Sequence, residues 1–306
     1  MQVNNILSLF RKNKQVGEII EKSKIDKYNL YCNGMTFNHT ILLASSVYRA
    51  NNEFIMLVYN NAFLANKAYD SLCDVLGYEY INLYAVDDFV ANEAIAISGE
   101  LKQERLSTIK SIIENKPKII VTHIQALLKP LISLNNFKNS IIKIEKDKEL
   151  DINELVTKLT NMGYKRTSVT YSIGEFSIRG EVIDIYPSCS DNPIRINLAF
   201  DEVEQIKYYN IENQMTVGDK INEFNIYPIN EIIIDFDTEE LRKNLLKLDN
   251  SEYVVEDLAD IFELGAYDKL VKYIDYFDKD NSTLLNYLDN PIVFLNEIKD
   301  TIGFSK

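Results

Sequence analysis

Apolar residues in the first 145 positions recur in two alternating patterns. Short apolar runs predict strands at residues 28–32, 54–59, 80–84, 118–122 and 140–145. Stretches with helical spacing lie between them, at residues 40–50, 62–76, 100–114 and 123–128, and two short amphipathic helices are predicted at residues 5–11 and 16–22. Strands that alternate with helices are typical of a parallel sheet. We therefore expect an α/β fold with helices on both faces of a parallel sheet.

The pattern changes near Asp151. A helix at residues 152–162 is followed by four or five short predicted strands that end near Ile232. Residues 194–198 alternate apolar and polar with period two, which is typical of a half-buried antiparallel strand. The helical pattern returns near Asp235, and residues 291–295 predict one more buried strand. We expect an α/β domain at 1–145, a smaller β-rich domain at 146–232, and a return segment at 233–306 that completes the first domain.

Composition narrows the class of protein. The 306 residues are 46% apolar and 26% charged, as in ordinary globular proteins. No apolar run is long enough to span a membrane, residues 1–14 lack a signal-peptide core, and the three cysteines lie far apart. A cytoplasmic protein without a metal site or a disulfide framework is expected. The net charge of −13 argues against duplex DNA binding by this chain, because such binding depends on lysine and arginine.

One block is far more specific than the rest of the chain. Residues 174–187 read GEFSIRGEVIDIYP, and residues 194–202 read IRINLAFDE. The block resembles the UvrA-docking module shared by bacterial transcription-repair coupling factors (Mfd) and the excision-repair subunit UvrB. Further segments are similar to the coupling factors, namely LYAVDD at 83–88, ELKQER at 100–105, IIVT through ALL at 119–128, TLLNYL at 283–288 and IVFLNE at 292–297.

The coupling factors are the closer match. UvrB carries an aromatic-rich hairpin that probes damaged DNA, and the matching place here, FVANEA at 89–94, is too short and too poor in tyrosine. The resemblance implies a degenerate helicase-like α/β domain interrupted by a β-rich domain that docks UvrA. It also implies that this chain recruits UvrA without catalysis. RNA polymerase, DNA and ATP-driven translocation would belong to parts of the parent protein outside this chain.

A helicase-like fold prompts a search for a nucleotide site. A phosphate-binding loop needs G-x-x-x-x-G-K-[ST], in which lysine neutralises phosphate charge and the hydroxyl holds magnesium. The loop expected between a strand and a helix starts at Gly34, and it has His39, Thr40 and Ile41 at the remaining motif positions. Asn296 and Glu297 stand where a magnesium-positioning Asp-Glu pair would follow the last strand, and Glu297 is expected to be an exposed residue at a helix start. We therefore expect no nucleotide, cofactor or metal.

The two histidines give no catalytic site by themselves. Asn38 and His39 suit a helix cap or a surface position better than a phosphate contact. His123 follows a predicted strand and precedes a helix, where a capping or surface residue is usual.

Alternation along the strands gives the docking block a geometry. It places Ile194, Ile196, Leu198 and Phe200 toward the core and Arg195 and Asn197 on the other face, while Ser177 and Arg179 point away from Phe176 and Ile178. From the residues alone, this is an ordinary solvated sheet face.

The resemblance assigns that face to UvrA. It implies that Arg166, Arg179 and Arg195 gather there, and the predicted contact residues are Arg166, Phe176, Arg179, Arg195 and Asn197. The chain departs from its relatives at Ser177, where UvrB has arginine, and at Asn197, where glutamate is usual. Because Arg179 and Arg195 are expected on the solvent side, their truncation should hardly change stability.

Two alternative functions stay open at this point. One is a UvrB-type nucleotide-dependent DNA-repair helicase fragment, and the other is a protein-interaction scaffold unrelated to repair.

Overall fold

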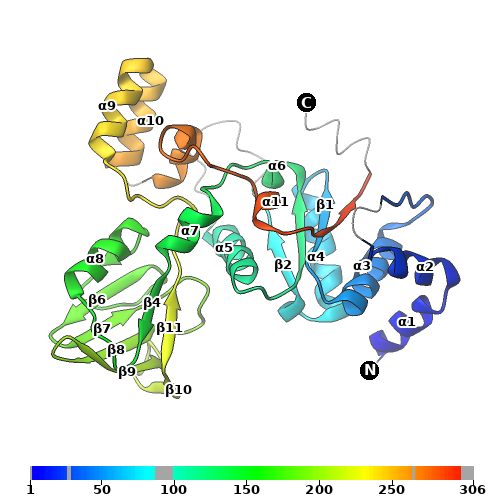
Figure 1. Cartoon of the computed structure of the whole chain (residues 1–306), viewed down its shortest axis with the longest axis horizontal. Helices are drawn as coiled ribbons and strands as arrows, with labels where there is room; N and C mark the ends of the chain where they lie inside the picture. The colour runs from blue at the N-terminus through cyan, green and yellow to red at the C-terminus, as the bar shows by residue number, and fades with distance from the viewer. Residues whose placement is uncertain (1, 26–28, 87–98, 264–265, 298–306) are drawn as a thin grey trace. The chain divides into compact units, whose positions relative to one another are not determined.

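The computed structural model describes residues 2–25, 29–86, 99–263 and 266–297 (Figure 1). The chain divides into two compact units, Pro130–Ser282 and the remainder, Met1–Lys129 with Thr283–Lys306. The predicted replacement of the UvrB hairpin, residues 89–94, lies outside the described residues.

The first unit contains a parallel sheet with strand order β12-β1-β3-β2. Its strands are β1 (Ile55–Tyr59), β2 (Ile81–Tyr84), β3 (Ile119–His123) and β12 (Ile292–Leu295). All three pairings are parallel, with Ile55 opposite both Ile119 and Ile292. The fold class and these four predicted strands are confirmed. However, β12 is a half-exposed edge strand and not the buried strand expected.

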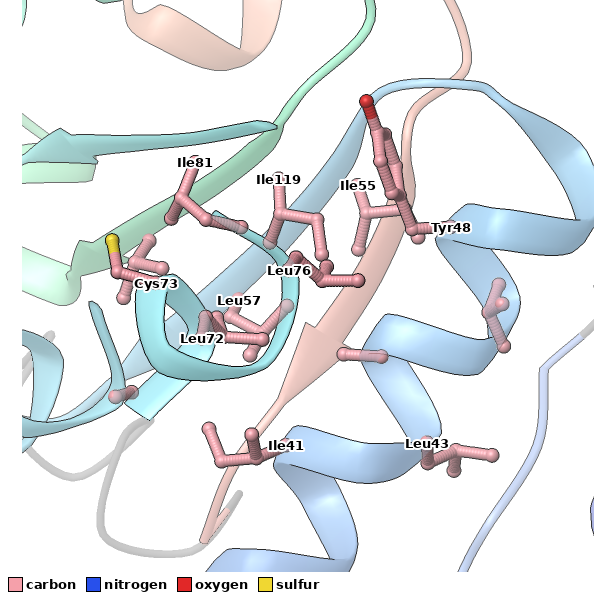
Figure 2. Packing of buried hydrophobic residues seen from close by; sticks show 14 of the residues in the cluster. Ile41, Leu43, Tyr48, Ile55, Leu57, Leu72, Cys73, Leu76, Ile81 and Ile119 are labelled. Atoms are coloured by element: carbon pink, nitrogen blue, oxygen red, sulfur yellow. The ribbon is translucent and has the colours of Figure 1, made fainter. Parts of the chain in front are cut away.

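Helices cover both faces of this sheet. The helices of this unit are α1 (Gln2–Arg11), α2 (Lys14–Lys22), α3 (Phe37–Asn51), α4 (Ala62–Leu76), the 3-10 helix η1 (Tyr78–Tyr80), α5 (Gly99–Ile113), α6 (Ile124–Leu127) and α11 (Leu284–Tyr287). Helices α1 and α2 pack on α3. Figure 2 shows α3 and α4 packing their buried side chains against Ile55, Leu57, Ile81 and Ile119. On the opposite face, Asn82 of β2 donates a hydrogen bond to Thr108 of α5.

Helix α4 illustrates how local sequence sets an element. Asn61 caps it by accepting a hydrogen bond from the backbone N–H of Leu64, and the chain leaves the helix at Gly77, whose φ is 104°. Its buried residues recur every three or four positions and end in the apolar pair Leu72 and Leu76. Burial of such side chains contributes about 1.5–3 kcal/mol each, so the apolar stripe holds the helix on the sheet.

Two of the strands that the sequence assigned to this sheet are not part of it. Residues 29–32, the described part of the predicted strand at 28–32, form no strand. The run at 140–145 does form a strand, β4 (Ile142–Glu145), but it pairs antiparallel with β11 (Glu223–Ile226) in the second unit. Within β4, buried Ile142 and Ile144 flank exposed Lys143, and this period-two alternation is typical of an antiparallel strand rather than of a doubly covered parallel one.

The second unit is built on a six-stranded sheet with order β10-β9-β8-β7-β6-β5. Its strands are β5 (Lys165–Arg166), β6 (Glu175–Arg179), β7 (Val182–Ile185), β8 (Ile194–Ala199), β9 (Glu202–Tyr209) and β10 (Thr216–Ile221). One face packs on α8 (Ile152–Asn161) and on the β4–β11 pair in a single apolar core. The remaining elements are α7 (Leu134–Ser140), α9 (Thr238–Leu248), α10 (Glu252–Glu263) and η2 (Tyr267–Tyr276). Residues 165–226 therefore hold seven strands, β5 to β11, instead of four or five.

The unit boundaries fall at 129/130 and 282/283, whereas the sequence prediction put domain boundaries at 145/146 and 232/233. The difference arises because β4 joins β11 and because the helices at 238–276 belong to the second unit. Among the described residues, no helix is long and apolar enough to cross a membrane. In the same residues, no group of three acidic, histidine or cysteine side chains is arranged to hold a metal ion.

Candidate docking site

The six-stranded sheet has one apolar face and one polar face. Register places Ser177 of β6, Asp184 of β7, Arg195 of β8 and Lys207 of β9 side by side. Side chains of residues paired across strands point to the same face. The polar face therefore brings together residues that are up to 30 positions apart in the chain. It lies opposite the core face that carries buried Ile183 and Ile196.

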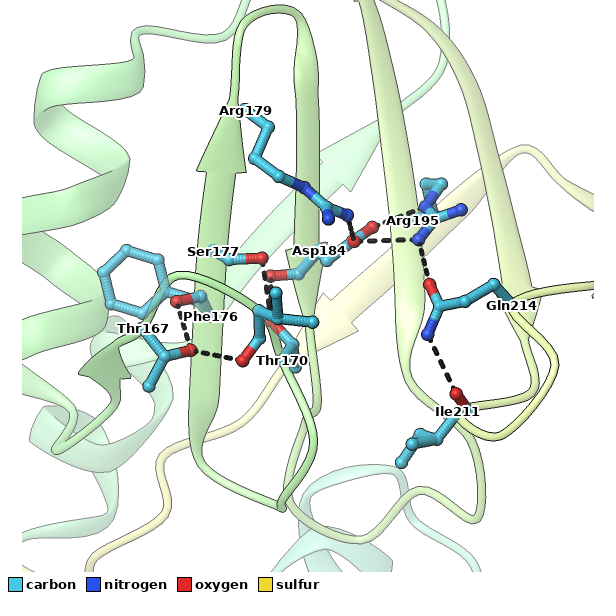
Figure 3. A network of polar contacts seen from close by, with 10 residues as sticks. Thr167, Thr170, Phe176, Ser177, Arg179, Asp184, Arg195, Ile211 and Gln214 are labelled. Atoms are coloured by element: carbon cyan, nitrogen blue, oxygen red, sulfur yellow. Dashed lines mark hydrogen bonds and ion pairs between the residues drawn. The ribbon is translucent and has the colours of Figure 1, made fainter.

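Asp184 is the centre of this face (Figure 3). Its carboxylate accepts a hydrogen bond from Arg179 at 2.6 Å and two from Arg195, at 2.6 Å from Nε and 2.9 Å from an Nη atom. The Asp184 side chain is 1% exposed, whereas the Arg195 and Arg179 side chains are 18% and 47% exposed. A buried carboxylate is costly unless charged donors satisfy it. Two arginines meet that requirement here and leave the cluster with one net positive charge.

Arg195 is held on three sides. Besides Asp184, it donates a hydrogen bond at 2.7 Å to Gln214 Oε1, and its guanidinium lies 4.4 Å from the centre of the buried Tyr209 ring. Gln214 is itself anchored through Nε2 to the carbonyl of Ile211. The hydrogen bond to Asp184 raises the pKa of Arg195, and burial together with the Asp184 charge raises the pKa of Tyr209 to about 12. Arg195 is therefore a fixed cation beside a neutral phenol.

These contacts correct the expectation that both arginines are freely solvated. Arg195 is largely buried and is part of the folded structure, because Asp184 needs its charge. Arg179 is the arginine of the pair that reaches solvent. The sequence indicated which face the arginines share, but it did not show that an acid between Ile183 and Ile185 joins them.

The loop between β5 and β6 closes one end of the polar face. Thr170 is buried and donates a hydrogen bond to Ser177 Oγ at 3.1 Å, while the Glu175 carboxylate accepts from the backbone N–H groups of Tyr171 and Ser172. Ser177, where UvrB has arginine, is therefore covered and not exposed. Sequence reasoning missed Thr170, Tyr209 and Gln214 as members of this site. Thr170 and Gln214 lie in loops that fold back over the sheet, and Tyr209 lies on a different strand, β9, from Arg195.

The other predicted contact residues lie in different environments. Phe176 is fully buried in the core, so it supports the strand and does not form a contact surface. Arg166, on the edge strand β5, is exposed and pairs in register with Phe176, which assigns it to the opposite face from Arg179 and Arg195. The structure therefore brings Arg179 and Arg195 together but does not bring Arg166 to them. Asn197 is half-buried on the arginine face, and its Oδ1 atom has no hydrogen-bond partner among the described residues.

One residue of the predicted core face lies elsewhere. Phe200 is 89% exposed, because the chain turns between β8 and β9 and its side chain no longer follows the alternation of the strand.

The loop that stands in the place of a phosphate-binding motif makes helix-capping contacts. Thr36 caps α3 by accepting from the His39 N–H, and His39 Nδ1 lies 3.4 Å from the Thr36 nitrogen, which completes a capping box. The His39 ring also stacks on Phe10 of α1, with ring centres 6.4 Å apart. Ile41 is buried in the core. The capping role predicted for His39 is confirmed, whereas the strand predicted before this loop is not formed.

The remaining residues predicted for the nucleotide site contact the backbone or face solvent. The Thr40 hydroxyl donates to the Thr36 carbonyl at 3.4 Å, and Gly34 sits at φ 75° before the helix. Asn296 donates from its backbone and side chain to the carbonyl of Val58. Glu297 is exposed as expected, in a bend with φ 48°.

His123 stands at the N-cap position of α6, as predicted, but its side chain makes no capping hydrogen bond and does not reach the surface. Its side chain is buried, and Nε2 lies 3.1 Å from the Val86 nitrogen and 3.0 Å from the Val86 oxygen. It thereby ties the end of β3 to the segment after β2.

Comparison with known proteins gives this geometry a context. Residues 142–232 match the family described as UvrB interaction domain. The chain is 29% identical over 284 residues to the transcription-repair-coupling factor of Bacillus subtilis (strain 168), which covers 87% of this chain and 24% of that protein. It is 29% identical over 294 residues to the protein of the same name from Staphylococcus aureus (strain bovine RF122 / ET3-1), covering 89% and 25%. The predicted resemblance is confirmed, and the chain spans about a quarter of the length of these curated relatives.

Proposed function

We propose that this chain is a non-catalytic module that recruits UvrA, as part of a transcription-repair coupling factor. The observation that carries the proposal is the Arg179–Asp184–Arg195 cluster on an open sheet face inside the region that matches the UvrB interaction domain. In this proposal, stalled RNA polymerase, DNA and ATP-driven translocation are handled by the rest of the parent protein.

The cluster has the chemistry of a docking site for an acidic surface. A guanidinium has five N–H donors, and Arg179 donates a hydrogen bond to Asp184 while almost half of its side chain faces solvent. Its remaining donors can form charge-assisted, bidentate hydrogen bonds with a carboxylate of a partner. Asp184 holds the guanidinium in place before binding, so less side-chain freedom is lost when the partner arrives.

The start of helix α3 supports the non-catalytic part of the proposal. Thr40 and Ile41 replace the lysine and the magnesium-binding hydroxyl residue of the phosphate-binding motif. Ile41 is buried in the core and does not face a ligand. The His39 N–H, which a phosphate would need, is already bonded to the Thr36 hydroxyl.

The test is quantitative binding of the whole chain to purified UvrA, with Arg179→Ala and Arg179→Glu as variants. Arg179→Ala is expected to weaken binding at least about tenfold and Arg179→Glu to weaken it further, because a charged pair at an interface loses one partner. Arg242→Ala is the matched control, since Arg242 is a partly exposed arginine of the same unit that lies on α9. Absence of binding by the unmodified chain would refute recruitment, and equal binding by Arg179→Glu would refute this face.

Two other functions predict different results. A UvrB-type nucleotide-dependent enzyme should bind ATP with magnesium in calorimetry and should hydrolyse it. A scaffold unrelated to repair should fold normally and show no affinity for UvrA.

A further inference from the structure

The turn between β8 and β9 presents an aromatic side chain in an unfavourable backbone conformation. Ala199 pairs with Glu202, so Phe200 and Asp201 form a two-residue hairpin turn. Of these two, Phe200 alone has a positive φ, 60°. Two-residue turns with a positive φ at the first central position strongly prefer glycine there. A bulky residue with φ above zero is an outlier that points to strain retained for a function.

Burial within this chain does not stabilise the Phe200 side chain. Phe200 is 89% exposed, the largest exposed fraction among the large hydrophobic residues described. A glycine at this position would relieve the backbone strain and remove the exposed ring. Neither local conformation nor burial therefore explains phenylalanine here.

The turn is nevertheless rigid. The segment that follows β4 runs along it, and Leu150 N–H donates to the Asp201 carbonyl at 2.7 Å. Val203 N–H donates to the Lys148 carbonyl at 2.9 Å, and Asp147 N–H donates to the Val203 carbonyl at 2.8 Å. Glu149 and Glu202 form a further backbone bridge. Phe200 is thus displayed on a fixed support, which lowers the ordering cost of inserting it into a partner.

The charges around the ring indicate what it contacts. The exposed neighbours in the turn and in the supporting segment comprise four acids and two lysines: Asp147, Glu149, Asp201 and Glu202, with Lys146 and Lys148. An apolar ring inside an acidic rim fits an apolar pocket flanked by basic side chains.

The turn is continuous with the docking face. Strand β8 carries Arg195 and Asn197 on that face and ends at the turn. Five residues of strand place Phe200 roughly 17 Å from Arg195 along the chain. A standard interface covers about 800 Å² on each partner, which is wide enough to include both.

We propose that Phe200 is the apolar anchor of the same interface and enters a pocket with a basic rim on UvrA. This inference rests on the function proposed above. Arg179 then supplies the polar contact and Phe200 the buried contact, and the register places Arg179 level with Asn197, at the end of β8 that leads into the turn.

The test measures UvrA affinity and thermal unfolding of the whole chain carrying Phe200→Gly. Glycine fits a φ of 60°, so the melting temperature should stay unchanged or rise, while affinity should fall at least about tenfold. Phe200→Leu keeps an apolar side chain and should lose less affinity. Phe63→Ala is the matched control, because Phe63 is 74% exposed on helix α4 of the other unit, and it should leave affinity unchanged.

The outcomes separate this inference from the proposed function. If the unmodified chain does not bind UvrA, the proposed function fails and the inference fails with it. If it binds and Arg179→Glu weakens binding while Phe200→Gly does not, only the inference is overturned. Unfolding of both Phe200→Gly and Phe200→Asn would show a structural role and overturn it. A change in the oligomeric state of the chain alone with Phe200→Gly would assign the ring to self-association instead.

Discussion

Asp184 and Arg195 face each other on neighbouring antiparallel strands, and the carboxylate of one accepts two hydrogen bonds from the guanidinium of the other. The acid is buried and the arginine nearly so, and Arg179 adds a third hydrogen bond from the exposed side. The residues proposed to bind a partner are therefore also residues that hold the sheet together, and variants must be chosen with both roles in view.

Arg195→Ala should destabilise the chain by about 1–3 kcal/mol, because it leaves a buried charged acceptor with only one partner. It also removes the packing of the guanidinium on Tyr209. Arg179→Ala should cost less than about 1 kcal/mol, as expected for a partly solvated ion pair. Urea unfolding of both variants measures the two free energies. Equal costs for the two arginines would contradict the difference in burial.

The pairing of Asp184 with Arg195 should appear as energetic coupling. In a double-mutant cycle of Asp184→Asn and Arg195→Met, the coupling free energy should be about 0.5–3 kcal/mol, because the two side chains share hydrogen bonds in a water-poor environment. The same cycle with Asp184→Asn and Arg242→Ala is the control and should give additive effects. Additivity in the first cycle would mean that solvent already screens the pair.

The helical part of the second unit should lose stability in acid through Asp257. Burial alone would raise the pKa of Asp257, but hydrogen bonds from Lys272, Lys269 and Tyr273 outweigh burial and lower it. A carboxyl group whose folded pKa lies below its unfolded value of about 3.9 stabilises the fold above that pH, and this stability is lost as pH falls through the folded pKa.

Asp257→Asn should therefore lower the free energy of unfolding by about 1–3 kcal/mol at neutral pH. The difference in free energy of unfolding between this variant and the unmodified chain should shrink below about pH 4, where the acid becomes protonated in the unfolded state. Chemical denaturation at a series of pH values measures this. A difference that stays constant down to pH 2 would show that the charge of Asp257 is not responsible.

His39 should contribute to the stability of the fold and not to nucleotide binding. His39→Ala removes one half of the capping box and the stack on Phe10, so it should cost about 0.5–2 kcal/mol. Calorimetry with ATP and magnesium should show no binding heat before or after the change. Micromolar ATP binding that disappears in His39→Ala would instead make the loop a working nucleotide site.

Local patterns were sufficient where a residue's role depends on its near neighbours. The spacing of apolar residues after Asn61 predicted helix α4 with its observed bounds, since capping and helical periodicity act within a few positions. Alternation in β8 correctly separated Ile194 and Ile196 from Arg195 and Asn197. The block at 174–202 pointed to the coupling factors without any structure.

Tertiary structure decided the features that depend on partners far along the chain. The apolar content of residues 142–145 did not reveal that their partner strand lies about 80 positions later, because strand pairing is set by long-range register. The burial of His123 against Val86, and the covering of Ser177 by Thr170, required loops to be placed over the sheet.

The same distinction applies to the residues of the docking site. Strand alternation was enough to predict that Arg195 leaves the core face, because alternation is a property of the backbone. Only the folded sheet decided that Arg195 and Arg179 share Asp184, since this needs β6, β7 and β8 in one register. Only the folded turn shows that Phe200 leaves the core, because the chain reversal between β8 and β9 ends the alternation and a segment 50 residues earlier holds the turn through backbone hydrogen bonds.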